Sequence, residues 1–294
     1  MRMPVPPTDH RLPIVLIRWL LVCSLALGLA GCGLGLVYPQ LDTVAGFYIK
    51  GLVTLDKAQS AALKRTLAHD LEWHRRSELD RYAAFLREVA GAVEGGAGHD
   101  EWLAASRRAE EYWRDIFEQA APGYTALAAT FTDAQVAELL ANLEREDEEA
   151  WREFSEYTPQ ARQARREKSV RRALERFTGP LTPAQRAIIR DDAARSRSFM
   201  AEWRGNRRVW RGALAEAMAR RNSGADFEAR MFVLIARPDE LWTPPYRAAL
   251  ERRREELIAL MVALDASLTP RQRATAQRQL LALADEVEGI RKRG

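Results

Sequence analysis

The spacing of apolar residues is the feature that most restricts the fold of this chain. From residue 56 to residue 292, apolar side chains recur three or four positions apart with charged side chains between them, the pattern of amphipathic helices. No segment alternates apolar and polar residues over the length of a strand. The sequence therefore predicts an all-α protein, an elongated multi-helix bundle of about seven to eight helices. The predicted helices cover residues 56–92, 100–120, 133–156, 159–177, 183–221, 226–236, 244–266 and 270–292.

Four helix starts share one pattern, an apolar residue followed by Thr or Asp and, three positions later, Gln. It occurs at Leu55–Gln59, Phe131–Gln135, Leu181–Gln185 and Leu268–Gln272. The Thr or Asp can accept a hydrogen bond from the Gln backbone amide while the Gln side chain bonds back, which makes a capping box. Helix ends are predicted at the glycine-rich segment 94–98 and at Pro122–Gly123, since both residue types interrupt helices.

The N-terminus has the composition of a targeting segment. Three arginines precede an apolar stretch over residues 19–30. A membrane-spanning helix needs about 20 apolar residues, whereas a signal-peptide core needs about 7 to 15, so the length favours a signal peptide. The stretch ends in Leu29, Ala30, Gly31 and Cys32, which resembles the lipobox of bacterial lipoproteins. The resemblance implies cleavage before Cys32 and attachment of lipid to its thiol.

The lipobox resemblance gives the chain an expected organisation. It comprises a signal peptide over residues 1–31, a lipidated N-terminus with a short apolar lead over residues 32–50, and a helical periplasmic domain over residues 51–294. Lipoproteins of this type carry three acyl chains, including palmitate, and each buried methylene contributes about 0.8 kcal/mol to membrane binding. Because Gly33 rather than Asp follows the cysteine, the resemblance implies the outer membrane, facing the periplasm. The inner membrane, and an uncleaved anchor with an unmodified Cys32, are the alternatives.

Charge and cysteine content exclude several classes of protein. The formal net charge is +4, from 45 basic and 41 acidic residues, and removing residues 1–31 lowers it to about +2. Such a balance provides no concentrated basic field, so no nucleic-acid partner is expected. Cys23 and Cys32 are the two cysteines, too few for a disulfide framework or a four-thiolate metal site.

Two family resemblances follow from these patterns. The four helix starts resemble the L-T-x-x-Q motif of the Spy and CpxP family of periplasmic chaperones and stress sensors, which are smaller and soluble. The lipobox, the aromatic-rich lead at residues 38–48 and the segment Trp73–Tyr82 resemble an uncharacterised family of proteobacterial lipoproteins, a domain of unknown function. This second resemblance implies a helical body with a lipid anchor and supplies no activity.

The sequence offers little catalytic or metal-binding chemistry. His69, Asp70, Glu72 and His74 form the one local cluster of metal-ligand types, but His69 and His74 are five positions apart and point in different directions on a helix. Asp70 and His74 share a face, which predicts an ion pair or hydrogen bond between them. No metal site, cofactor or catalytic residue is predicted, because nucleophile and phosphate-binding motifs are also missing.

Charges are segregated along the chain. Residues 144–153 hold six acids and two arginines, whereas residues 162–176 hold seven bases and two acids. We expect the two stretches to pair as antiparallel helices on either side of Thr158–Pro159. The alternative is a basic surface that binds anionic lipid, lipopolysaccharide or an acidic partner. The tryptophans outside the signal are expected in the core, with a ligand groove as their alternative.

These observations predict a binding or scaffold protein of the cell envelope rather than an enzyme. The membrane, reached through lipid on Cys32, is its expected partner, with an envelope protein or anionic lipid as a further one. A chaperone-like or envelope-stress role is the first alternative, motivated by the four capping boxes. An envelope hydrolase with a site assembled between helices is the second.

Overall fold

The computed structural model describes residues 34–293, so the predicted signal and the Leu29–Cys32 box lie outside the described residues. The all-α prediction is confirmed, because residues 34–293 contain helices and no strand. The predicted number of helices is too low, since eleven helices have twelve residues or more. The elements are α2 (Leu34–Val37), η1 (Tyr38–Gln40), α3 (Leu41–Leu52), α4 (Lys57–Ser77), α5 (Leu79–Gly95), α6 (His99–Ala129), α7 (Asp133–Glu156), α8 (Pro159–Thr178), α9 (Pro183–Arg195), α10 (Met200–Ala219), α11 (Ala225–Ala236), η2 (Pro238–Leu241), α12 (Pro244–Ala266) and α13 (Pro270–Lys292).

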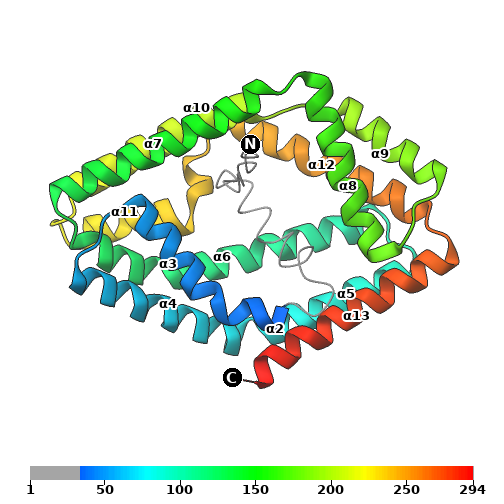
Figure 1. Cartoon of the computed structure of the whole chain (residues 1–294), viewed down its shortest axis with the longest axis horizontal. Helices are drawn as coiled ribbons and strands as arrows, with labels where there is room; N and C mark the ends of the chain where they lie inside the picture. Colours follow the sequence, from blue (N-terminus) through cyan, green and yellow to red (C-terminus); the bar gives the residue numbers. More distant parts are fainter. Residues whose placement is uncertain (1–33, 294) are drawn as a thin grey trace, which may run out of the picture.

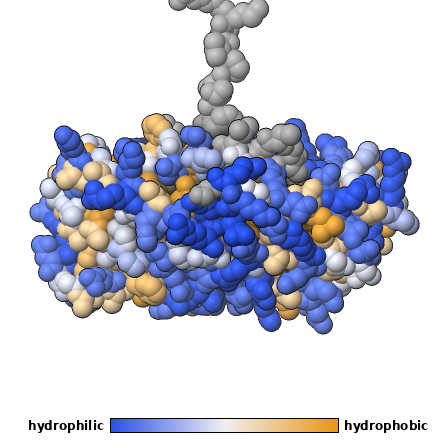
Figure 2. All heavy atoms as spheres, turned by 90° about the horizontal axis from the view of Figure 1, so that it is seen from below, coloured by the Kyte–Doolittle hydropathy of each residue, from blue (hydrophilic) through white to orange (hydrophobic). Residues whose placement is uncertain are grey.

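The helices follow one another around a flattened, elongated body. In Figure 1, α7 and α10 run side by side along one edge, and α5 and α13 run side by side along the opposite edge. Helices α8, α9 and α12 close one end, while α4, α6 and α11 pack together at the other. The side view in Figure 2 shows a thin body whose visible surface is mostly hydrophilic. None of the helices within residues 34–293 is both long enough and apolar enough to cross a membrane.

The three additional helices have two sources: the expected apolar lead contains a helix, α3, and two predicted helices are each divided. Residues 56–92 form α4 and α5, separated at Glu78 although helical hydrogen bonding continues through it: the Glu78 N–H donates to the His74 carbonyl at 3.0 Å. Residues 183–221 form α9 and α10, separated where the backbone at Ser196 is extended. The Ser196 hydroxyl lies within hydrogen-bond distance of Arg253 and Glu256 on α12. Neither division is marked by a glycine or a proline, so the stop signals in the sequence do not report them.

The predicted helix end at Pro122–Gly123 is wrong, because α6 continues through both residues to Ala129. A side chain at Gly123 would place its Cβ 2.6 Å from the Thr66 methyl group of α4. Glycine at this position therefore permits close packing of α6 on α4 rather than ending the helix. The other predicted stop is confirmed, since α5 ends at Gly95 and Gly96 has a φ of +91°.

All four predicted capping boxes form, and they associate in two pairs. The boxes at Asp56, Thr132, Thr182 and Thr269 each have both reciprocal hydrogen bonds. The Gln59 and Gln135 side-chain amides bond each other, and Gln185 and Gln272 do the same with distances of 2.8 and 2.9 Å. Each glutamine amide nitrogen also donates to the carbonyl that lies two residues before the N-cap of the partner helix. The acceptors for Gln59, Gln135, Gln185 and Gln272 are the carbonyls of Thr130, Thr54, Ser267 and Pro180, in that order. The fold thus contains the same junction twice.

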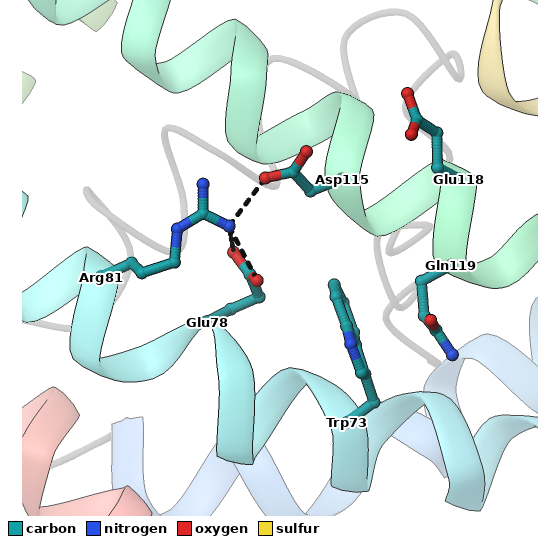
Figure 3. A pocket seen from close by; sticks show the side chains of 6 residues that line it. All are labelled: Trp73, Glu78, Arg81, Asp115, Glu118 and Gln119. Atoms are coloured by element: carbon teal, nitrogen blue, oxygen red, sulfur yellow. Dashed lines mark hydrogen bonds and ion pairs between the residues drawn. The ribbon is translucent and has the colours of Figure 1, made fainter.

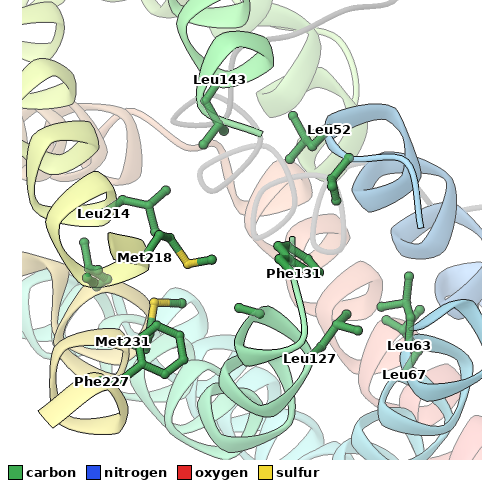
Figure 4. Packing of buried hydrophobic residues seen from close by; sticks show 14 residues of the cluster. Leu52, Leu63, Leu67, Leu127, Phe131, Leu143, Leu214, Met218, Phe227 and Met231 are labelled. Carbon is green, nitrogen blue, oxygen red and sulfur yellow. The ribbon is translucent and has the colours of Figure 1, made fainter. Parts of the chain in front are cut away.

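The largest apolar cluster lies where α3, α4, α6, α7, α10 and α11 meet. Leu63, Phe131, Leu143, Met218 and Phe227 are among its buried members, and Figure 4 shows them converging from separate helices. Burying a side chain of this size contributes about 1.5 to 3 kcal/mol each. A second cluster joins α2 to α5 and α13, so the first described residues are already part of the folded body.

Candidate functional site

A polar cleft lies at the junction of α4 and α5, on the side that faces α6. Its volume is about 340 Å³, within the range of small-ligand sites. Figure 3 shows Trp73, Glu78 and Arg81 reaching it from the α4–α5 side, and Asp115, Glu118 and Gln119 reaching it from α6. The helix interruption at Glu78 brings side chains of two successive helices to one cleft.

One guanidinium holds two carboxylates at the centre of this cleft. Arg81 Nη1 lies 2.9 and 2.8 Å from the two Glu78 carboxylate oxygens and 2.7 Å from Asp115 Oδ2. Glu78 is buried, with 2% exposure, whereas Arg81 is partly exposed. Burial raises the pKa of Glu78, while the bonds from Arg81 oppose that rise. Glu118, on the same wall, pairs with Arg237 at 2.7 Å.

Aromatic side chains support the cleft from behind. Tyr38 of η1 places its hydroxyl 3.0 Å from His74 Nδ1, and the rings of His74, Tyr82 and Tyr112 follow one another at centroid distances of 5.3 and 4.8 Å. The Tyr112 hydroxyl donates to the Arg81 carbonyl at 3.2 Å. Burial lowers the pKa of His74 to about 4 and raises the pKa of Tyr82. His74 is therefore neutral at neutral pH and forms part of the packed interior.

The predicted contact between Asp70 and His74 is wrong. His74 turns toward Tyr38, and Asp70 Oδ2 is a buried oxygen with no hydrogen-bond partner in the described structure. Burial raises the pKa of Asp70 to about 6. His69 points elsewhere and lies 3.3 Å from the Gln119 amide nitrogen. Within residues 34–293 no group of three or more His, Cys, Asp or Glu side chains could hold a metal ion.

The acidic stretch of α7 pairs with α10, so its predicted antiparallel pairing with the basic stretch of α8 is wrong. Buried Asp147 accepts hydrogen bonds from Arg207 Nε, at 2.8 Å, and from Arg211. Arg204 binds Glu148 with both distances at 2.8 Å. Helix α8 instead packs on α9 and α13, and only the 3.9 Å contact of Arg165 with Glu153 links the two stretches through charge.

The tryptophans lie both in the core and along the polar cleft. Trp203 is 2% exposed and belongs to a core cluster, as expected. Trp210 donates its indole N–H to the Leu234 carbonyl at 3.1 Å, which fixes α10 against α11. Trp73 instead lines the cleft, where its ring forms a wall beside the carboxylates. An aromatic wall with carboxylate, guanidinium and amide groups suits a ligand with polar edges and a flat or apolar face.

The sequence did not reveal the cleft residues as a site. Glu78 and Arg81 stand three positions apart inside the segment Trp73–Tyr82, a spacing that usually gives an exposed helix pair. The burial of Glu78 and the contribution of Asp115 depend on how α6 packs, which spacing alone does not report. Cys32, Leu29, Ala30 and Gly31, the predicted site residues, lie outside the described part of the chain.

The described residues form an all-helical protein with a polar cleft between α4, α5 and α6. A model for a family of unknown function, DUF6279, matches residues 51–247, about two thirds of the sequence, and the chain belongs to this family. The matched range includes the whole cleft and the first pair of capping boxes. No curated protein and no solved structure gives a significant match.

Proposed function

We propose that this protein is a lipid-anchored binding or scaffold protein of the bacterial cell envelope, held at the outer membrane and facing the periplasm. The observation that carries the proposal is the order of segments at the N-terminus. A basic region, an apolar core of signal-peptide length and the box Leu29–Cys32 come directly before a folded helical body that begins at Leu34. Lipid on Cys32 would attach this body to the membrane.

The anchor is tested by mass spectrometry of the mature N-terminus. We expect a chain that begins at Cys32 and carries diacylglycerol on its thiol, and we expect Cys32→Ser to block processing or release the protein from membranes. Cys23→Ser is the matched control, because Cys23 lies in the part of the chain that the cleavage removes. An unmodified Cys32 or a retained signal would refute the proposal.

The binding role is supported by the cleft between α4, α5 and α6. A photo-reactive amino acid at Gln119, which lines the cleft, should crosslink to a specific partner in intact envelopes. The same group at Gln160, which is exposed on α8, should not give that adduct. Identical products from both positions would argue against a ligand site in the cleft.

A chaperone-like role is the second candidate, and the paired capping boxes favour it. The four helix starts resemble the L-T-x-x-Q pattern of the Spy and CpxP chaperones, and those at Leu181–Gln185 and Leu268–Gln272 match it in full. Both glutamine pairs are hydrogen-bonded. Suppression of aggregation of a denatured client at equimolar ratio would support this role, and no suppression would count against it.

An envelope hydrolase is the third candidate, favoured by the two carboxylates that share Arg81. Glu78, with its raised pKa, and Asp115 would supply the acid and base groups of such a reaction. Hydrolysis of an envelope polymer that is lost in both Glu78→Gln and Asp115→Asn would support it.

A further inference from the structure

Helix α3 presents apolar side chains to the outside of the body. Phe47 is 73% exposed, Val44 60% and Tyr48 38%. Phe47 and Tyr48 lie three and four positions after Val44, so the three side chains lie on one side of the helix. The opposite face of α3 packs into the largest core cluster. Asp42 and Lys50 are the charged residues of α3, and they lie near its two ends. The Tyr48 hydroxyl donates to Glu146 of α7 at 3.1 Å, so Tyr48 is held against α7, and Val44 and Phe47 are the most exposed apolar side chains of this face.

The N-terminal end of the body lies directly beside the proposed lipid anchor. Leu34 is 3% exposed, and its N–H donates to Glu286 Oε1 of α13 at 2.9 Å. Because consecutive Cα atoms are 3.80 Å apart, Cys32 is covalently held within about 7 Å of this fixed residue. The surface that carries α2 and α3 must then lie close to the bilayer, with no linker to hold it away.

Basic residues flank the same corner of the molecule. Helix α13 packs on α2, and Arg291, Lys292 and Arg293 at its end are exposed. Arg291 is paired with Asp80 at 2.6 Å. The Arg293 guanidinium lies over Gly35, where a Cβ would come within 2.7 Å of Nη2. Exposed cations at the membrane side of an anchored protein attract anionic lipid head groups.

We propose that Val44 and Phe47 of α3 lie in the head-group region of the phospholipid leaflet that holds the anchor. The inference rests on the proposed function, because lipid on Cys32 is what brings α3 to the bilayer. An interfacial helix typically inserts its apolar face about 5 to 10 Å below the surface. Lys50 is long enough to keep its charge among the head groups while α3 lies flat. The broad body would then be held in one orientation.

The proposal is tested with the lipidated protein in vesicles of phosphatidylethanolamine and phosphatidylglycerol. The mature chain has no thiol besides the modified Cys32, so Phe47→Cys provides a unique site for an environment-sensitive fluorophore. We expect its emission to shift to the blue on reconstitution and to be quenched by spin-labelled lipid. Val209→Cys is the matched control, because Val209 is also exposed, at 47%. It lies on α10, behind α7 in the view where α3 is in front, and its label should stay in water.

The outcomes separate this inference from the anchor itself. Mass spectrometry of the same sample reports whether Cys32 carries lipid, and an unmodified Cys32 overturns both proposals. With lipid present, a label at position 47 that is as water-exposed as the label at position 209 overturns the α3 inference alone. Shielding at position 47 without quenching by lipid, together with energy transfer between labelled chains, also overturns it, because a second copy would then cover α3.

Discussion

The side-chain amides of Gln59 and Gln135 hydrogen-bond to each other in both directions, at 3.1 and 2.6 Å. Each glutamine simultaneously closes the capping box of its own helix. Two helix starts that lie 76 positions apart in the sequence are therefore tied into one junction. Gln185 and Gln272 make the equivalent junction on the other side of the fold, where both residues are buried.

Gln185→Ala should destabilise the fold substantially. The side chain is fully buried, and its removal takes away the bonds that it makes to the Ser267 carbonyl and the Thr182 N–H, as well as both bonds to Gln272. Loss of buried hydrogen-bond partners costs about 1 to 3 kcal/mol for each group left unsatisfied, so we expect a loss of about 3 kcal/mol. Chemical denaturation measures it, with Gln160→Ala on the exposed surface of α8 as the control. A double-mutant cycle with Gln272→Ala should show clear coupling, and additive losses would refute the junction.

The sequence predicts helices best where local chemistry decides their ends. The predicted helices 133–156, 244–266 and 270–292 agree with α7, α12 and α13 to within a residue, because an N-cap Thr marks the start of each one. Prediction fails where packing decides. No glycine or proline marks the interruption at Glu78. Gly123 lies inside α6, where it allows α4 to pack closely, and it does not end the helix.

The candidate site is hidden from the sequence for a related reason. The sequence shows that α7 carries many acids, but it does not show that buried Asp147 binds Arg207 and Arg211 of α10. Likewise, Glu78 and Asp115 belong to different helices and meet only through Arg81. Segregated charge was visible in the sequence, whereas the choice of partner helix depends on the three-dimensional order of the helices.

Asp147→Asn should be among the most destabilising polar substitutions. It removes the charge that neutralises two guanidinium groups, and one nitrogen of Arg207 already has no hydrogen-bond partner in the described structure. Breaking a buried ion pair from one side typically costs about 3 to 5 kcal/mol. Glu148→Gln is the matched control, since its pair with Arg204 is largely exposed and should contribute about 0 to 1 kcal/mol. Equal losses in the two variants, measured by denaturant unfolding, would contradict the assignment.

Burial of His74 predicts a loss of stability in acid. Its pKa is about 4 in the folded protein against 6.5 ordinarily, so the unfolded chain binds more protons between these values. Stability contributed by neutral His74 is present above pH 6.5 and is lost as the pH falls toward 4, by up to about 3 kcal/mol.

The opposing effect of Asp70 must be separated from that of His74. Its pKa is raised to about 6, so its contribution weakens as the pH rises from 3.8 to 6. Comparing the pH dependence of unfolding in His74→Gln and in the unmodified protein isolates the His74 component. An NMR titration supplies an internal control, because Asp100 and Glu255 raise the pKa of His99. If His74 titrated together with or above His99, burial of its ring would be refuted.

Arg81→Met should destabilise the fold in a manner that depends on pH. Without Arg81, the buried Glu78 carboxylate loses its guanidinium partner, and its pKa, already raised by burial, rises further. A folded-state pKa above the unfolded value gives stability that is present at low pH and is lost as the pH rises above about 4.5. We therefore expect a deficit in the free energy of unfolding of about 2 kcal/mol at pH 8 that shrinks toward pH 5, measured by denaturant unfolding at both values.

Arg108→Met is the control, because it removes an exposed pair with Glu111 on α6. It should change the free energy of unfolding by less than about 0.5 kcal/mol at either pH. A deficit of equal size at both pH values would indicate that Arg81 acts through packing alone, and would remove the charge-based account of the cleft.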